Sequence, residues 1–471
     1  MTKYLIVYLL LFTIAANSYG QPKKAILIGN LDFLTNKDSV KLDVAKLKSF
    51  FHDADFITSY RTSVNSHVFK FEIPVNNYPQ YADLIFSKAK TDKSIPNLIV
   101  EEGDSVSILQ TKRGYLFEGQ GSFKYNVILH LKNIFIQKFR YYNSDDPAIV
   151  LQNYENHDSI AIAELLYLDT CKSQLSEKVY LLLKADIIGM DLSKGFTIFP
   201  FYPQLTTPFI YALKNFKQEG YLTAKIASLE RDTNNLINSL GYCQSIIFRY
   251  KIDSCYLKGK DFNIKGCYTY LKNNYRGNFR DGLVTYFLFD RRRGTQDISD
   301  CINDALGFMV DTDFRNVLLK VRSSNLKGST AADFSLVDAN NHTRSFSDFK
   351  GKVILIDFWF TGCGACRATA PILSKIEHLF ANKPVVFISI SIDGNKNIWL
   401  KSLANGKYTS KTSINLFTGG KRDTDPIIRH YSIAAFPTLI LIDKNGKLTD
   451  GVGDIRYDNG KRLEAMINSV L

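Results

Sequence analysis

The 471-residue sequence predicts a multidomain chain with a β-sandwich-like N-terminal domain, an α-helical middle region and a C-terminal α/β domain. Three observations support this architecture. The chain is too long to fold around a single hydrophobic core, so it should divide into about two to four domains. Apolar residues change from alternate positions to every third or fourth position near residue 122, and strands alternate with helices after residue 327. The composition, 45% hydrophobic and 22% charged, is that of a globular protein.

Residues 1–20 have the pattern of a cleavable secretory signal. Lys3 precedes an apolar run from Tyr4 to Ala16. Small residues follow at Ser18 and Gly20, the −3 and −1 positions of a cut before Gln21. The apolar run is shorter than the ~20 residues that span a bilayer, and an uncleaved N-terminal membrane anchor is the alternative. We therefore expect an exported protein that is soluble after cleavage of the signal.

Residues 21–121 are predicted to form the β-sandwich-like domain. Short apolar or alternating runs are separated by Asn, Asp, Gly and Pro, as expected for strands joined by turns. The runs are KAILIG, SVKLDV, HVFKFEIPV, NLIV, SVSIL and YLFEG.

Residues 122–326 are predicted to be helical, because apolar residues recur at spacings of three and four. The spacing is clear in VILHLKNIFIQKF, IAIAELLYLDTCKSQL, KVYLLLKADIIGM and DCINDALGFMVDTDFRNVLLKV. Five cysteines fall in this region: Cys171, Cys243, Cys255, Cys267 and Cys301. Their odd number leaves at least one unpaired, and spacing does not reveal the pairing. We expect buried small side chains, with room for one or two structural disulfides.

Residues 327–471 are predicted to form an α/β domain with a mixed sheet and helices on both faces. The small, polar stretch SSNLKGSTAADF marks the boundary with the helical region. The predicted strands are VILIDFWF, VVFISISID and TLILID, and the predicted helices are ACRATAPILSKIEHLF, DPIIRHYSI and GKRLEAMINSVL.

Cys363 and Cys366 lie where a predicted strand meets a predicted helix, in DFWFTGCGACRATAP. A zinc site needs four ligands, usually as two pairs, and the nearest histidines, His378 and His430, are isolated. We therefore predict no metal and no cofactor. Two buried structural cysteines are disfavoured, because side chains at such a junction emerge at the edge of the sheet. The spacing favours a redox-active dithiol.

This junction favours thiol chemistry at Cys363. A free thiol with a pKa of ~8.5 is only a few per cent ionised at pH 7, and the N–H groups and dipole of a helix N-terminus favour its anion. Arg367 adds positive charge nearby. The spacing lets Cys366 reach back to Cys363, so one cysteine can attack a substrate disulfide and the other can resolve the mixed disulfide.

These motifs resemble the thioredoxin fold, specifically the TlpA/ResA-like family of secreted bacterial thiol–disulfide oxidoreductases. DFSLVDANNHTRSFSDFKGKVILIDFW is similar to the family's lead-in hairpin, turn and central strand. Pro371 stands five residues after Cys366, and AAFPTLILIDKNGK is similar to the family's cis-proline segment, strand and turn. The resemblance covers the chain from about Phe334 to its end. Upstream, Pro96–Asn126 is similar to a β-rich domain of unknown function that often precedes such domains.

The resemblance implies a role for each matching residue. Cys363 would be the attacking cysteine and Cys366 the resolving one. Asp357 matches a buried acid that helps to accept the proton of the resolving thiol, and a strand-end carboxylate satisfied by hydrogen bonds is the alternative. Pro437 would be the cis-proline that faces the dithiol, where nearby backbone can pair with an extended substrate segment.

Four further residues are expected to line the substrate site: Trp359, Phe436, Gly364 and Ala365. Packing alone is the alternative explanation for the two aromatic residues. The chain departs from the family pattern at Gly362, where relatives carry Trp, at Ala365, where proline is common, and at Ser389, where thioredoxin has lysine. These departures leave the redox potential open, and with it the direction of electron flow.

The expected function is an exported thiol–disulfide oxidoreductase that reduces protein disulfides in the periplasm or envelope of a bacterium. Its electron donor would be a membrane thiol–disulfide protein. A thiol oxidant or isomerase is one alternative, and an envelope binding or scaffold protein with an accessory thioredoxin domain is another. A peroxiredoxin is excluded, because its P-x-x-x-T/S-x-x-C pattern would require Pro at Ile356 and Thr or Ser at Phe360.

The formal net charge of +13 comes from Lys and Arg spread along the whole chain. The densest run, DRRRG at Asp290–Gly294, has acidic neighbours and no accompanying nucleic-acid motif. We therefore expect a solvated basic surface and no nucleic-acid partner.

Overall fold

The computed structural model describes residues 24–46, 56–75, 78–87, 93–112, 114–139, 147–194, 229, 236–255, 258–291, 296–410 and 412–471. The predicted signal at residues 1–20 lies outside these ranges. Packing divides the chain into two compact units. The first comprises the described residues within 1–44, 59–132 and 171–179, and the second comprises those within 45–58, 133–170 and 180–471.

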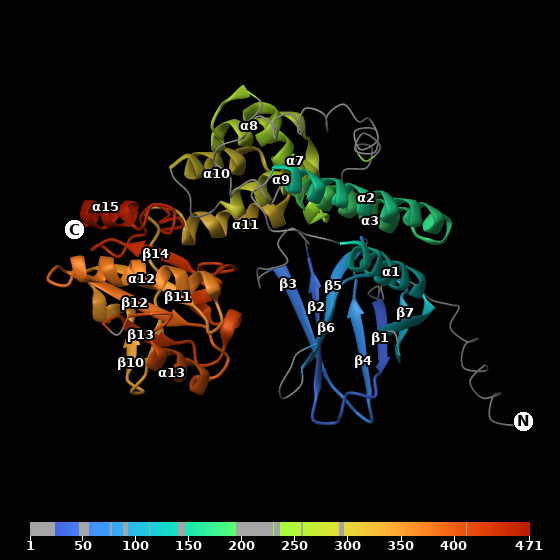
Figure 1. Cartoon of the computed structure of the whole chain (residues 1–471), viewed down its shortest axis with the longest axis horizontal. Helices are drawn as coiled ribbons and strands as arrows, with labels where there is room; N and C mark the ends of the chain where they lie inside the picture. The colour runs from blue at the N-terminus through green and yellow to red at the C-terminus, as the bar shows by residue number, and fades with distance from the viewer. Residues whose placement is uncertain are drawn as a thin grey trace, which may run out of the picture. The chain divides into compact units, whose positions relative to one another are not determined.

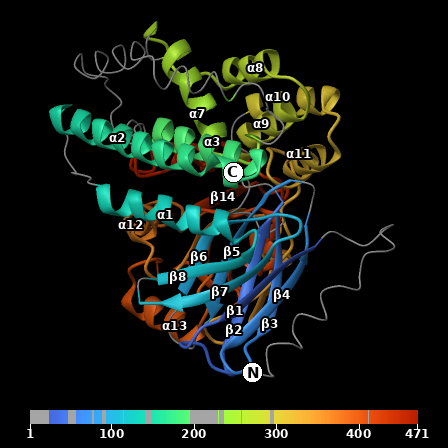
Figure 2. The ribbon, with the colours of Figure 1, turned by 90° about the vertical axis from the view of Figure 1, so that its right-hand side faces the viewer.

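The first unit is built on two four-stranded sheets, in the orders β4-β1-β7-β8 and β3-β2-β5-β6 (Figure 2). β1 pairs antiparallel with β4 and parallel with β7. One continuous core contains side chains from both sheets, which is the packing of a β-sandwich. The strands are β1 (Lys24–Asn30), β2 (Ser39–Ala45), β3 (Ile57–Ser63), β4 (Val68–Pro74), β5 (Gln80–Ser87), β6 (Lys93–Val100), β7 (Ser105–Thr111) and β8 (Gly114–Gln120).

Alternating burial explains most of these strands. In β4 every second residue faces the core, which is the period of a half-buried strand. Each run predicted from the sequence falls on a strand, but β3 and β5 were not predicted. β3 has no fully buried residue, so its sequence ITSYRTS lacks the apolar alternation that identifies a strand.

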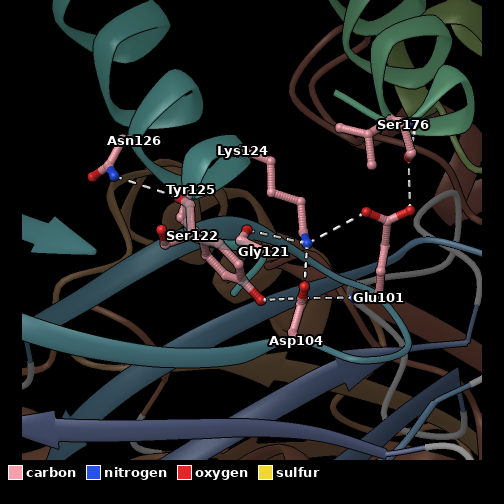
Figure 3. Close-up of polar contacts among 9 residues, drawn as sticks. Glu101, Asp104, Gly121, Ser122, Lys124, Tyr125, Asn126 and Ser176 are labelled. Atoms are coloured by element: carbon pink, nitrogen blue, oxygen red, sulfur yellow. Dashed lines mark hydrogen bonds and ion pairs between the residues drawn. The ribbon is translucent and has the colours of Figure 1, made fainter. Parts of the chain in front are cut away.

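A buried ionic network joins the turn between β6 and β7 to the helix that follows β8 (Figure 3). Nζ of Lys124 forms ion pairs with the carboxylates of Asp104 and, at 3.3 Å, of Glu101. The hydroxyl of Tyr125 donates to Asp104 at 2.8 Å, and that of Ser176 donates to Glu101 at 2.9 Å. Lys124 and Asp104 are each 4% exposed. Burying both charges is costly, and the pairing offsets that cost.

The described residues between 122 and 326 are mainly helical, as predicted. α9 is buried along most of its length and contacts α7, α8, α10 and α11, so it is central among these described helices. The helices are α1 (Ser122–Lys138), α2 (Pro147–Cys171), α3 (Glu177–Lys194), α7 (Leu240–Tyr250), α8 (Ile264–Asn274), α9 (Gly277–Asp290), α10 (Gln296–Phe308) and α11 (Thr312–Ser324).

The five cysteines of this region are buried thiols, so the one or two structural disulfides that the sequence left room for do not form. Burial raises the pKa of Cys267 to about 12 and that of Cys301 to about 11. Such thiols are rarely ionised at neutral pH and behave as small apolar side chains.

The C-terminal domain has a six-stranded mixed sheet in the order β10-β9-β13-β12-β11-β14 (Figure 1). β11 pairs in parallel with β12 and antiparallel with β14. The mixed sheet was predicted, whereas β13 and α13 were not. The elements are β9 (Ser335–Asp338), β10 (Thr343–Ser345), β11 (Val353–Trp359), α12 (Gly364–Leu379), β12 (Val385–Ser391), α13 (Lys396–Asn405), β13 (Ile414–Phe417), α14 (Pro426–His430), β14 (Thr438–Ile442) and α15 (Lys461–Val470).

Helices cover both faces of this sheet, as predicted. All seven residues of β11 are buried, as expected for a strand enclosed on both sides. Val353 and Leu355 of β11 share a core with side chains of α12 and α15. Ile354 and Ile356 share another core with side chains of α14. The fold thus fixes the end of β11 and the start of α12 on a rigid frame.

Candidate active site

Cys363 and Cys366 lie at the start of α12, at the predicted strand-to-helix junction. Cys363 is the N-cap residue, and its Sγ accepts a hydrogen bond from the N–H of Cys366 at 3.0 Å. The two sulfurs form a disulfide, with Cα atoms 5.3 Å apart. A backbone N–H at the positive end of the helix therefore faces the sulfur of Cys363, which is the arrangement that stabilises a thiolate.

Asp357 is buried on β11, opposite Ser389 of β12 and Leu439 of β14. Burial raises the pKa of its carboxyl to about 7. Among the described residues, neither Oδ1 of Asp357 nor Oγ of Ser389 has a hydrogen-bond partner. The alternative of a carboxylate fully satisfied by hydrogen bonds therefore does not describe this side chain.

A small cavity adjoins Asp357 and Ser389. Its wall also contains the hydroxyl-bearing residues Thr409, Ser410 and Ser413. The space open to the centre of a water molecule is about 10 Å³, which is close to what a single water needs. A carboxyl that titrates near neutrality beside a cavity with hydroxyl groups in its wall can take up and release a proton at physiological pH.

Phe436, in the segment before β14, packs near the dithiol. The peptide bond between Phe436 and Pro437 is cis, as the resemblance implies. Phe436 packs against the apolar cluster that contains Cys363 and Cys366. Its ring meets that of Phe360 edge-on, with centroids 5.4 Å apart and an interplanar angle of 89°. Phe360 and Phe436 together place two aromatic rings beside the cysteines.

The four residues expected at the substrate site differ in exposure. Gly364 is exposed, and Ala365 and Phe436 are half-buried. Trp359 is fully buried in the cluster around the cysteines and stacks on Tyr408, with ring centroids 5.2 Å apart. Trp359 therefore supports the site by packing and presents no surface to a substrate.

Sequence reasoning missed three residues that hold the loop before Cys363, namely Thr361, Asp393 and Tyr408. The carboxylate of Asp393 accepts two hydrogen bonds from Thr361, and the hydroxyl of Tyr408 accepts one from the N–H of Gly362. One available signal was that Asp393 is the last residue of the predicted strand VVFISISID, because the carboxyl ends of parallel strands meet at one edge of a sheet.

Within the described ranges, no group of three or more His, Cys, Asp or Glu side chains could hold a metal ion. No helix in the same ranges is long and apolar enough to cross a bilayer.

Comparison with known proteins identifies relatives of the C-terminal domain. A family model described as thioredoxin-like matches residues 351–448. The thiol-disulfide oxidoreductase ResA of Geobacillus kaustophilus is 26% identical over 144 residues, which are 31% of this chain and 76% of that protein. The protein of the same name from Bacillus subtilis is 25% identical over 168 residues, 36% of this chain and 84% of its own.

A solved thioredoxin domain of a thiol-disulfide oxidoreductase from Bacteroides vulgatus is 28% identical; the match covers 31% of this chain and 99% of that one, with a TM-score of 0.28. The match to the family model contains β11, α12 with both cysteines, and Pro437. Through its C-terminal domain, the chain therefore belongs to the TlpA/ResA-like thioredoxin-fold proteins.

Proposed function

We propose that this chain is an exported thiol–disulfide oxidoreductase that reduces protein disulfides through Cys363 and Cys366. The observation that carries the proposal is the position of this pair, at the N-terminus of α12 and in the apolar cluster against which Phe436 packs. The names of the ResA relatives support the same chemistry.

The reaction consists of two thiol–disulfide exchanges. The Cys363 thiolate attacks one sulfur of the substrate disulfide, forms a mixed disulfide and releases the other sulfur as a thiolate. Cys366 then gives its proton to Asp357 and attacks Sγ of Cys363, which releases the second substrate thiolate and closes the Cys363–Cys366 disulfide. Two electrons pass from the dithiol to the substrate, and the released thiolates take up protons. Phe436, Pro437, Gly364 and Ala365 form the surface beside the reacting sulfurs.

Export and the electron donor are part of the same proposal. The signal pattern before Gln21 supports export to the periplasm or cell envelope of a bacterium. A reductase in that compartment is oxidised at each turnover and must be reduced again. The proposed donor is a membrane thiol–disulfide protein, which can carry electrons across to that compartment.

Insulin reduction by the full-length protein, with Cys363→Ser as control, tests the function. We expect turnover by the wild type and none by the variant. Equal turnover by both proteins would favour a scaffold whose thioredoxin domain is accessory. A reduction potential near about −120 mV, that of a strong oxidant, would contradict the reductive direction and support the oxidant alternative.

A further inference from the structure

The loop that carries Cys363, residues 360–363, is tethered by side chains that come later in the sequence. The N–H and Oγ1 of Thr361 donate to the two carboxylate oxygens of Asp393, each at 2.8 Å. Since that hydroxyl has one hydrogen, its 2.7 Å contact with Ser402 has Ser402 as donor. Asp393 is 7% exposed and also accepts from the hydroxyl of Ser391 at 2.9 Å. Ser391, which lies outside the loop, therefore also orients this carboxylate.

Tyr408 holds the next residue of the loop. The N–H of Gly362 donates to the Tyr408 hydroxyl at 3.0 Å, and the Tyr408 ring lies nearly parallel to that of the buried Trp359, at an interplanar angle of 7°. The N–H of Cys363 donates to the carbonyl of Phe360 at 3.2 Å. Three consecutive N–H groups before α12 are therefore bonded, two of them to side chains distant in sequence.

The conformation held in this way is one that only glycine adopts readily. Gly362 has a φ of +99°, in the region where side chains are disfavoured. With the loop in this form, Cys363 occupies the N-cap and its Sγ accepts the N–H of Cys366. Loss of either tether would let the loop move and would take the sulfur away from that N–H.

We propose that Asp393 and Tyr408 are positioning residues for Cys363, which hold the loop so that the Cys363 sulfur stays against the N-terminus of α12. The inference rests on the proposed role of Cys363 as the attacking cysteine and adds the residues that set its reactivity. It also gives a reason for Gly362. The loop conformation requires glycine there, and Tyr408 supplies an aromatic ring to the site from another segment.

Tyr408→Phe tests this proposal, because it removes one hydroxyl and keeps the ring against Trp359. Tyr431→Phe is the matched control, since the Tyr431 hydroxyl accepts the N–H of Ala332 at 2.7 Å in the core on the other face of the sheet. The readout is alkylation of Cys363 against pH in the reduced full-length protein, followed by peptide mass spectrometry. We expect Tyr408→Phe to raise the pH midpoint and to slow alkylation at neutral pH about two- to tenfold, the usual effect of one hydrogen bond. Tyr431→Phe should leave both unchanged.

An unchanged midpoint in Tyr408→Phe, or an equal shift in both Phe variants, would overturn the proposal. Asp393→Asn should shift the midpoint in the same direction as Tyr408→Phe, and a shift to lower pH would also contradict it. Alkylation requires no substrate disulfide. If the wild type failed to reduce insulin, the proposed function would be contradicted. The alkylation midpoints of the variants would still test the positioning roles separately.

Discussion

Asp357 and Ser389 lie opposite each other in the parallel pairing of β11 and β12, and neither Oδ1 of Asp357 nor Oγ of Ser389 has a hydrogen-bond partner among the described residues. Buried polar atoms are nearly always bonded. Two unbonded atoms beside a cavity with room for about one water therefore indicate a site where a proton can be exchanged.

Asp357→Asn should remove a pH dependence from the second thiol–disulfide exchange, in which Cys366 attacks the mixed disulfide at Cys363. Burial raises the pKa of Asp357 to about 7, so its ionised form, the one able to accept a proton, accumulates as the pH rises through neutrality. We expect the variant to resolve the mixed disulfide about 100-fold more slowly slightly above neutral pH, where Asp357 is ionised and a free thiol is still mostly protonated. Below about pH 5 both proteins should be equally slow. Rapid-quench analysis of the mixed disulfide measures this step.

Ser389→Ala is the control for that experiment, because it removes a hydroxyl from the wall of the same cavity and keeps the carboxyl. In Ser389→Ala, the rate of mixed-disulfide resolution should still rise with pH near neutrality. The same rise in Asp357→Asn would show that another group accepts the proton.

The same carboxyl should make the C-terminal domain less stable as the pH rises. Its pKa is about 7 when folded against a usual 3.8, so the folded state holds the proton more tightly. The stabilisation is complete below about pH 4 and is lost as the pH rises to about 7, a change on the order of 4 kcal/mol. Asp357→Asn should not show this loss.

Tryptophan fluorescence measures this unfolding within the whole chain. The only two tryptophans, Trp359 and Trp399, are both in the C-terminal domain and fully buried. Urea unfolding of both proteins at about pH 5 and pH 8 gives the comparison. A parallel pH dependence in wild type and variant would assign the effect to other groups.

Gly362 and Gly364 form a matched pair for the conformation of the loop. A Cβ atom at either position would meet no atom within 4 Å, so steric contact does not distinguish them. Gly362 has a φ of +99°, whereas Gly364 is the first residue of α12. Gly362→Ala should lose about 1 kcal/mol of stability, and Gly364→Ala should be neutral or slightly stabilising. Urea unfolding, monitored by tryptophan fluorescence, measures both stabilities. Equal losses of stability in the two variants would contradict the prediction.

The sequence predicted those parts of the fold and site that depend on local pattern. The buried run of β11, the helix after it and the spacing of Cys363 and Cys366 are all contiguous, and the structure contains each of them. β3 was not predicted, because none of its residues is fully buried and its sequence lacks apolar alternation. α13 has a usable signal, an N-cap at Asn395 whose side chain accepts two N–H groups, but the helix is only 10 residues long.

The tethers of the active-site loop could not be predicted in this way. Gly362 and Tyr408 are 46 positions apart, and Thr361 and Asp393 are 32 apart. Neither pair follows a helical or strand period, so only the folded chain brings them together. From the sequence, Gly362 is recognisable as a departure from the family pattern. The positive φ that favours glycine at this position is visible only in the folded chain.

Lys124→Met should strongly destabilise the first unit, because it leaves the buried carboxylate of Asp104 without its cation. Burial already raises the pKa of Asp104 in spite of Lys124. Removing one partner of a buried ion pair costs about 3 to 5 kcal/mol, since the remaining charge stays desolvated. The loss should be smaller at low pH, where Asp104 can take up a proton. Hydrogen exchange in peptides from β7 and α1 measures the effect.

Lys70→Met is the matched control for that prediction, because it removes the same side chain from an ion pair in the same unit. Lys70 pairs with Glu72 on the surface of β4, and the two side chains are 51% and 45% exposed. Exposed pairs of this kind contribute little, so exchange in β4 should stay at the wild-type rate. If Lys124→Met also left exchange unchanged, the network in Figure 3 would not stabilise the unit. If both variants accelerated exchange equally, the loss of any lysine, rather than of the buried pair, would be the cause.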